Sequence, residues 1–385
     1  MRLCGDGMPY DKQSFLSGVA AGRNMESWPA FEGAGKGITS FTIDTRLGSD
    51  ITTYQFWIKR ASYPYTDILI YWGDGTTSSA ANNLNSHEYP TPGMYTIVLF
   101  GYYEEINFSA SKTGTDESNS LLAIHTPFSI APIHNTYIVS LYTLFSGCRN
   151  LKTIPNRLLA EYYENGYKFS GLQYAFTNCK ALHQIPEDLF DGIEFSGTDP
   201  EFSQVFNGSG LEEIPSRLLA SPEFSKVKRA YMPFAGLNIT EIPAGLFNQF
   251  SNCRSFESVF QGCSFLETIP GGLFDSCAAV QSFRFSFLRC ESLQSLPSGL
   301  FSENEDVTDF TGTFQECASL ELVPLDTFNL SMNTMPIFSS CFRNDREIIS
   351  AVPDLWNYYP DSAHVGCFLN CSRAANYADI PSDWK

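Results

Sequence analysis

Apolar residues recur at fixed spacing along the C-terminal two thirds of the chain. A cysteine is followed by leucine three residues later, by an aliphatic residue after three more, and then directly by proline. The prolines at 243, 270, 297 and 324 are 27 residues apart. A fixed period of this length predicts a stack of units in which each unit covers the apolar faces of its neighbours. The phrase begins at Cys148, Cys179, Cys263, Cys290 and Cys317.

The repeated unit also carries phenylalanines at fixed places. One copy reads Phe256, Phe260, Cys263, Leu266 and Ile269 in order, followed by proline and a Leu-Phe pair. Stacked units place equivalent residues about 4.8 Å apart with their side chains parallel. That arrangement suits small buried thiols better than disulfides. The pattern therefore predicts a ladder of reduced, inward-facing cysteines at positions 148, 179, 263, 290, 317 and 371.

Five further cysteines do not keep this phase. Cys367 and Cys371 form a C-x-x-x-C pair, but no matching Cys or His pair stands near them in the sequence. A zinc site is therefore only weakly indicated. The out-of-phase residues are Cys4, Cys253, Cys277, Cys341 and Cys367.

The N-terminal third has a different pattern. The segment from Asp11 to Met25 has the spacing of one short amphipathic helix, which predicts either a packed strap or an attachment element for residues 1–37. Residues 38–110 contain β-branched and aromatic runs separated by turn residues, which predict an antiparallel β-sandwich. The runs are 38–43, 53–58, 67–72 and 94–100.

Within residues 38–110 a specific motif stands out. It consists of Trp72-Gly73-Asp74-Gly75, then His87 and Tyr89, then Gly93 and Tyr95. This order resembles the polycystic-kidney-disease (PKD) type of immunoglobulin-like domain. The glycines permit a tight turn and the Asp74 carboxylate can accept from turn amides. His87 beside Asp74 is therefore interpreted as structural, and the resemblance implies a spacer or adhesion module.

The repeats over about 141–385 resemble the BspA-like leucine-rich-repeat family, in which F-x-x-C-x-x-L-x-x-I ladders build a curved stack. The resemblance implies a short strand at each L-x-x-I segment and a turn or short helix at each P-x-x-L-F segment. The predicted fold class is an α+β multidomain protein, with a PKD/Ig-like β-sandwich followed by a BspA-like leucine-rich-repeat solenoid. The predicted domains are 1–37, 38–110 and 111–385, the last with terminal caps.

Charge narrows the possible partners. The formal net charge is −18 and the pI is about 4.6. An acidic surface repels phosphate backbones, so a nucleic-acid partner is not expected. No stretch approaches the roughly 20 apolar residues that a membrane span requires, and no Sec signal peptide is visible at the N-terminus.

The sequence offers little catalytic chemistry. None of the usual serine-hydrolase, zinc-protease or phosphate-loop motifs occurs. The ladder cysteines should be buried and inert. We therefore predict a protein that is not an enzyme and has no cofactor, with a glycoside hydrolase that uses paired acids as the remote alternative.

The residues between the fixed letters of the repeat are the predicted recognition positions. Acidic residues among them form either a solvated face or a binding strip for amines, sugar hydroxyls or Ca²⁺. Tyr162, Tyr163 and Tyr167, which we expect to be exposed, are a second candidate, because tyrosine gives contact area at low entropic cost. The candidate ligand-binding residues are Thr153, Gln184, Glu213, Glu241, Thr268 and Ser295.

Together these features predict a recognition or adhesion protein whose partner is a protein or glycan on a cell surface. The stretch from Phe15 to Arg23 is similar to the openings of some tail-associated proteins of gut-bacterial phages. One interpretation is therefore a phage or prophage structural protein, located in a virion, whose residues 1–37 bind the particle or another copy. The alternative is a bacterial cell-surface adhesin.

Overall fold

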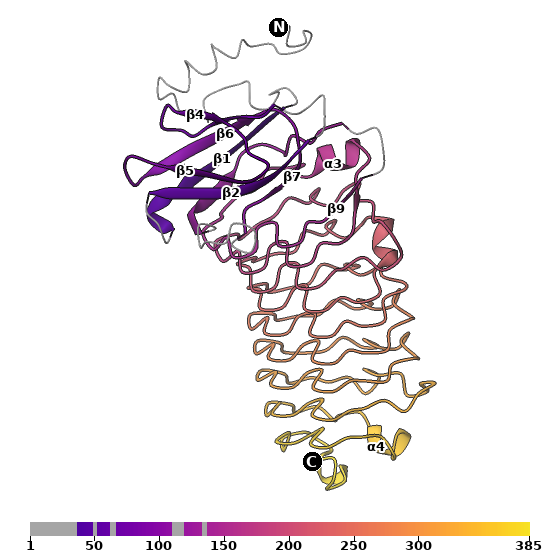
Figure 1. Ribbon diagram of the computed structural model, residues 1–385. Helices are drawn as coiled ribbons and strands as arrows, with labels where there is room; N and C mark the ends of the chain where they lie inside the picture. Colours follow the sequence, from indigo (N-terminus) through magenta and orange to yellow (C-terminus); the bar gives the residue numbers. More distant parts are fainter. Residues whose placement is uncertain (1–36, 49–51, 62–66, 110–118, 133–136) are drawn as a thin grey trace.

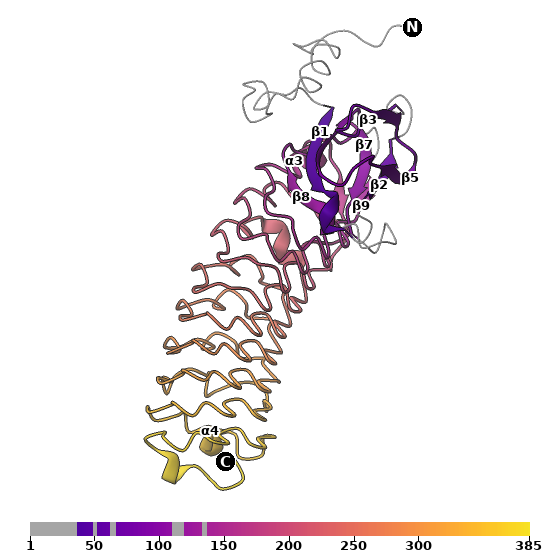
Figure 2. The same cartoon turned by 90° about the vertical axis from the view of Figure 1, so that its left-hand side faces the viewer.

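The computed structural model describes residues 37–48, 52–61, 67–109, 119–132 and 137–385. Two β-sheets lie at the N-terminal end, and a stack of coils leads from them to the C-terminus (Figure 1). The side view in Figure 2 shows the coils continuing directly from the sheets. The helix predicted between Asp11 and Met25 lies outside the described residues.

The two sheets are antiparallel throughout. One has the strand order β4-β3-β6-β1-β8 and the other has the order β5-β2-β7. The first sheet contains β1 (Ile38–Asp44), β3 (Leu69–Tyr71), β4 (Thr77–Ser79), β6 (Met94–Phe100) and β8 (Leu121–Ile124). The second contains β2 (Thr53–Arg60), β5 (Asn83–Glu88) and β7 (Tyr103–Asn107), and a 3₁₀ turn, η2 (Thr45–Leu47), follows β1.

Alternating burial explains why these segments form strands. Along β2, every second residue from Tyr54 to Ile58 is fully buried, while its neighbours are partly exposed. Phe41 of the first sheet packs edge-on against Phe56 of the second, with 5.4 Å between ring centroids. The arrangement is consistent with a β-sandwich, and strands are present in all four predicted runs.

The coils are mostly turns and irregular segments. One short parallel pair joins β9 (Ile138–Val139) to β10 (Lys168–Phe169). Elsewhere neighbouring coils meet through single parallel bridges, such as Ser255 with Ser282 and Ser282 with Asp309. The helical segments of the coils are α3 (Ala160–Glu164), η4 (Pro222–Lys226), α4 (Leu355–Tyr358) and η5 (Tyr377–Asp379).

The predicted fold class is therefore wrong. The protein is mostly β with antiparallel sheets, not α+β, and the described coils do not close into a leucine-rich-repeat solenoid. The predicted strand at L-x-x-I shrinks to a bridge, as between Glu241 and Thr268. Pro243 and Pro270 follow two residues later and have no N–H to continue a ladder. The P-x-x-L-F segment forms a turn, in which the Leu246 N–H donates to the Pro243 carbonyl at 3.3 Å.

The fixed phenylalanines build continuous columns inside the coils. Phe234, Phe260, Phe287 and Phe314 stack nearly in parallel, with successive centroids 5.8, 5.6 and 5.5 Å apart. Offset stacking of this kind adds to the stabilisation from burial alone. At the C-terminal end Trp384 packs on Phe368 and is itself buried, so it closes the column.

The predicted cysteine ladder is confirmed for the described residues. All the cysteines they contain are free and buried. Each ladder thiol donates to the carbonyl of a column phenylalanine in the preceding coil, as Cys263 does to Phe234 at 3.1 Å and Cys317 does to Phe287 at 3.2 Å. Burial raises the pKa of Cys263 to about 12, so the thiol stays protonated.

Candidate functional site: a polar groove across the coils

A short extended segment in each coil leads to the phenylalanine columns. Its inward residue is buried, for example Phe256 or Phe283, and the two residues before it lie at the surface. Single parallel bridges join these surface pairs from coil to coil. Two rows of surface residues therefore run across the stack: Lys228, Arg254, Gln281 and Thr308 in one, and Arg229, Ser255, Ser282 and Asp309 in the other.

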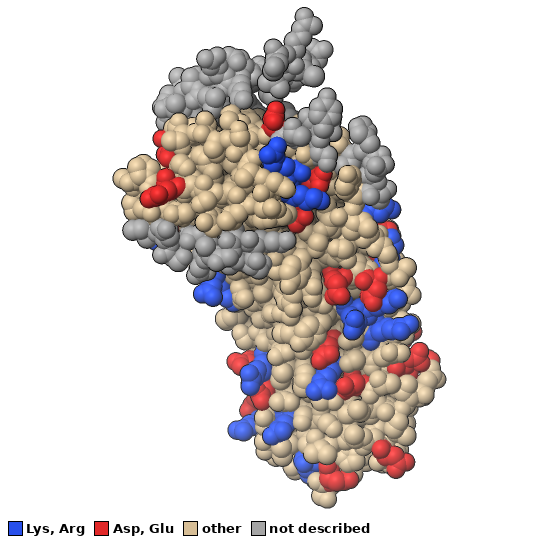
Figure 3. Space-filling model, in the orientation of Figure 1, with Lys and Arg blue, Asp and Glu red and all other residues tan. Residues whose placement is uncertain are grey.

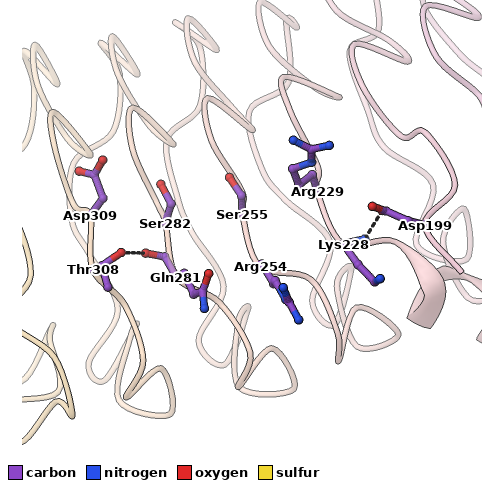
Figure 4. A pocket seen from close by; sticks show the side chains of 9 residues that line it. All are labelled: Asp199, Lys228, Arg229, Arg254, Ser255, Gln281, Ser282, Thr308 and Asp309. Atoms are coloured by element: carbon purple, nitrogen blue, oxygen red, sulfur yellow. Dashed lines mark hydrogen bonds between the residues drawn. The ribbon is translucent and has the colours of Figure 1, made fainter.

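A groove of about 580 Å³ follows these rows. Figure 4 shows the two rows side by side, with Asp199 next to Lys228 at one end and Asp309 at the other. The serines in the middle are short, which leaves the surface hollow between the longer side chains at the ends. The groove is lined by Asp199, Lys228, Arg229, Arg254, Ser255, Gln281, Ser282, Thr308 and Asp309.

The cations of the groove are not neutralised within it. Among the described residues, no carboxylate lies within ion-pair distance of Lys228, Arg229 or Arg254. Several arginines elsewhere on the coils are paired, as Arg289 is with Glu316 at 2.7 Å. Figure 3 shows one face, on which basic and acidic side chains lie intermixed over the coils. In a chain of net charge −18, this unpaired group is a local anion-attracting site.

The carboxylates at the ends are already engaged. Asp199 accepts from the backbone N–H of Lys228 at 3.3 Å. Asp309 accepts from the Thr311 N–H at 2.8 Å and lies 3.9 Å from the Arg284 guanidinium. The groove is therefore cationic over Arg229 and Arg254, and its far end presents the Asp309 carboxylate, whose charge Arg284 offsets in part.

The middle of the groove presents hydrogen-bonding groups. The Ser255 hydroxyl accepts from the Glu257 N–H, and the Ser282 hydroxyl accepts from the Arg284 N–H, both at 3.3 Å. Because these hydroxyls act as acceptors to the backbone, their own protons remain able to donate. The site can bind carboxylate or hydroxyl groups, and its lining holds no apolar or aromatic side chain.

The six residues predicted from the sequence lie on another line of the coils. Thr153, Gln184, Glu213, Glu241 and Thr268 are exposed and Ser295 is half-buried. Bridges such as Glu241 with Thr268 place them in one row, which we call the polar row. None of the six lines the groove. The prediction that Tyr162 and Tyr167 are exposed is wrong, because both are buried in the core.

Sequence reasoning missed the groove residues. Lys228 and Arg229 are adjacent cations in an acidic chain, and Arg254 follows close to one period later. That spacing is the signal that the sequence contains. The predicted recognition positions lie beside the L-x-x-I segment, whereas the groove residues lie before the phenylalanine columns.

The Trp-Gly-Asp-Gly motif forms a compact polar cluster on the sandwich. His87 Nε2 lies 2.8 Å from Asp74 Oδ2, and the Thr76 hydroxyl donates to Asp74 Oδ1 at 2.6 Å. Burial opposes ionisation of Asp74, but the bonds from Thr76 and His87 outweigh it and lower the pKa of that carboxyl. The His87 ring stacks on Trp72 with 4.7 Å between centroids. These contacts hold the turn together.

Comparison with known proteins does not place the chain in a family: no protein-family model matches it, and no curated protein is similar to it. None of its described helices has the length and apolar character required to cross a membrane.

Proposed function

We propose that this chain is a non-enzymatic recognition protein that binds an anionic partner, a protein or glycan of a cell surface, through the groove. One observation carries the proposal: Lys228, Arg229 and Arg254 line a hollow surface without ion-pair partners among the described residues. A guanidinium group can donate two parallel hydrogen bonds to the oxygens of a carboxylate or phosphate. Such a site therefore binds an anionic ligand through directional hydrogen bonds.

The scaffold supports a binding role. The repeated residues are buried in columns, which leaves the surface rows free to vary without loss of the core. A groove that crosses several coils suits a ligand longer than one residue or one sugar.

The carboxylates of the groove argue against hydrolysis of a glycan. Asp199 precedes the coil of Arg229, and Asp309 lies three coils beyond it. At about 4.8 Å per coil, the two groups are well over 10 Å apart. Paired-acid glycosidases need a separation of roughly 5 to 10 Å.

The setting of this recognition is part of the same proposal. Display on a virion, with attachment through residues 1–37, and display on a bacterial cell surface both present the coils to a partner. Fractionation of the native cells distinguishes them, as do neighbouring genes for tail or capsid proteins.

The proposal is tested by the binding of the purified full chain to a panel of gut bacteria. We expect saturable binding that Arg229→Gln with Arg254→Gln weakens at least tenfold, because each lost charge-assisted hydrogen bond is worth about 1.5 to 3 kcal/mol. The matched control, Arg343→Gln with Arg346→Gln, removes the same charge from exposed positions outside the groove. Absence of binding across the panel, or equal weakening by both pairs, contradicts the proposal.

A further inference from the structure

We infer that the groove binds a carboxylated oligosaccharide that lies along the stack, with a carboxylate over Arg229 and Arg254 and sugar hydroxyls over the serines. The inference rests on the proposed function and specifies its ligand. Three properties of the groove support it: its charge distribution, the chemistry of its middle section and its length.

The charge distribution disfavours a densely charged polyanion. Three cations line the groove, but Asp199 and Asp309 lie at its two ends. A chain with an anionic group at every unit would meet a carboxylate at each end. A ligand with separated carboxylates, linked by neutral polar units, avoids both repulsions.

The middle section favours hydroxyl groups. Ser255, Ser282 and the Gln281 side chain offer donors and acceptors at adjacent coils. Peptide partners are commonly anchored by buried aromatic or aliphatic side chains. The lining residues provide no apolar pocket for such an anchor, so the groove suits a saccharide better than an acidic peptide.

The length of the groove fits a short oligomer. The bridges from Arg229 through Ser255 and Ser282 to Asp309 span three coil spacings, or about 14 Å at the usual strand distance. An extended ligand of a few sugar units covers this distance. Its carboxylate end would lie at Arg229 and its hydroxyl-rich end near Asp309, which accepts hydrogen bonds.

Calorimetric titration of the full chain tests the inference with four probes. These are a hyaluronan tetrasaccharide, in which carboxylated and neutral sugars alternate, neutral maltotetraose, a heparin-derived tetrasaccharide and hexaglutamate. We expect the hyaluronan tetrasaccharide to bind at least tenfold more tightly than the other three. Arg229→Gln with Arg254→Gln should abolish that preference, and Arg343→Gln with Arg346→Gln should leave it unchanged.

A second variant separates shape from charge. Ser282→Leu fills the middle of the groove without altering its charge, and should weaken binding of the hyaluronan tetrasaccharide at least tenfold while the thermal midpoint stays close to that of the wild type. Tighter binding of heparin or hexaglutamate, lost in the Arg229 and Arg254 variant, would overturn the saccharide inference but preserve the proposed function. Absence of binding by every anionic probe, together with unchanged cell binding in that variant, would overturn both.

Discussion

One residue of the cysteine ladder is an aspartate. Asp345 follows Phe342 at the spacing at which Cys317 follows Phe314. It is fully buried, Oδ1 accepts from the Cys317 N–H at 2.8 Å, and Oδ2 has no hydrogen-bond partner among the described residues. Burial raises the pKa of this carboxyl well above its ordinary value, although the Cys317 N–H partly offsets the effect. Glu316, Cys341 and Cys371 also face it, and the negative charge of Glu316 raises its pKa further.

This carboxyl should make the stability of the folded chain depend on pH. Because the folded pKa is raised, the folded state keeps its proton longer than the unfolded state does. Stability is therefore full below about pH 4 and falls as the pH rises toward the folded pKa.

Asp345→Cys restores a cysteine to the ladder and removes the loss of stability at high pH. We expect the variant to gain about 1 to 3 kcal/mol in the free energy of unfolding at pH 8, and the gain to shrink as the pH approaches 4. Urea unfolding at several pH values measures it. A gain that does not change with pH would show that Asp345 is not the titrating group. The control Cys290→Ser, elsewhere in the ladder, should show no such pH dependence.

At the scale of a coil, two residues flank each column phenylalanine in the left-handed backbone region. Around Phe287 these are Phe285 and Arg289, with φ of 55° and 60°. Around Phe314 they are Gly312 and Glu316, with φ of 59° and 63°. Side chains other than glycine occupy several of these places, so the turn is imposed by packing of the columns and not by glycine alone.

Gly312 should tolerate no side chain, because a Cβ there would lie 2.5 Å from the Phe285 ring of the neighbouring coil. We expect Gly312→Ala to cost about 1 to 3 kcal/mol in the free energy of unfolding, measured by urea denaturation. Gly271→Ala, where nothing lies within 4 Å, should change it by less than about 0.5 kcal/mol. Combining Gly312→Ala with Phe285→Ala should recover part of the loss, and strict additivity of the two changes would refute the clash.

The sequence predicts the buried side chains of the coils but not their backbone conformation. Periodic Phe and Cys residues identify the buried columns, because a core needs the same side chain at the same place in each coil. The strand expected at each L-x-x-I segment is reduced to a bridge, because Pro243 and its equivalents interrupt pairing, whereas the P-x-x-L-F segment forms the turn that was one of its two predicted forms. Residues such as Phe285 carry no local signal for a positive φ.

At the scale of the molecule, the sandwich and the coils share one core. Phe108 stacks on Phe145 of the first coil, with 5.5 Å between centroids and planes 7° apart. The Cys148 thiol donates to the Phe108 carbonyl at 3.8 Å, as later ladder thiols do to later column residues. Phe108 is therefore the first residue of the phenylalanine column and belongs to the sandwich. We expect the sandwich and the first coils to unfold as one cooperative unit.

Phe108→Ala tests this coupling. We expect a loss of about 3 to 5 kcal/mol, with hydrogen exchange accelerated both in β7 and in the coil that contains Phe145. Phe368→Ala at the opposite end is the matched control, and its effect should stay within the last coils. Acceleration in the sandwich alone would contradict a shared core.

The groove is also a property of the whole molecule, which is why the sequence did not reveal it. Lys228, Arg254 and Asp309 belong to different coils and meet only when those coils stack. The net charge of −18 indicated an acidic surface. A net charge is a sum over the whole chain, so it gives no sign of the three cations that line the groove. The predicted polar row from Thr153 to Ser295 is the competing surface on the same coils.

A crystal structure of the full chain with the hyaluronan tetrasaccharide is the most direct test of recognition through the groove. We predict that the oligosaccharide lies between Arg229 and Asp309, with a carboxylate within hydrogen-bonding distance of the Arg229 or Arg254 guanidinium and hydroxyls on Ser255 and Ser282. An oligosaccharide bound along the polar row, or a groove left empty at saturating ligand, would contradict it.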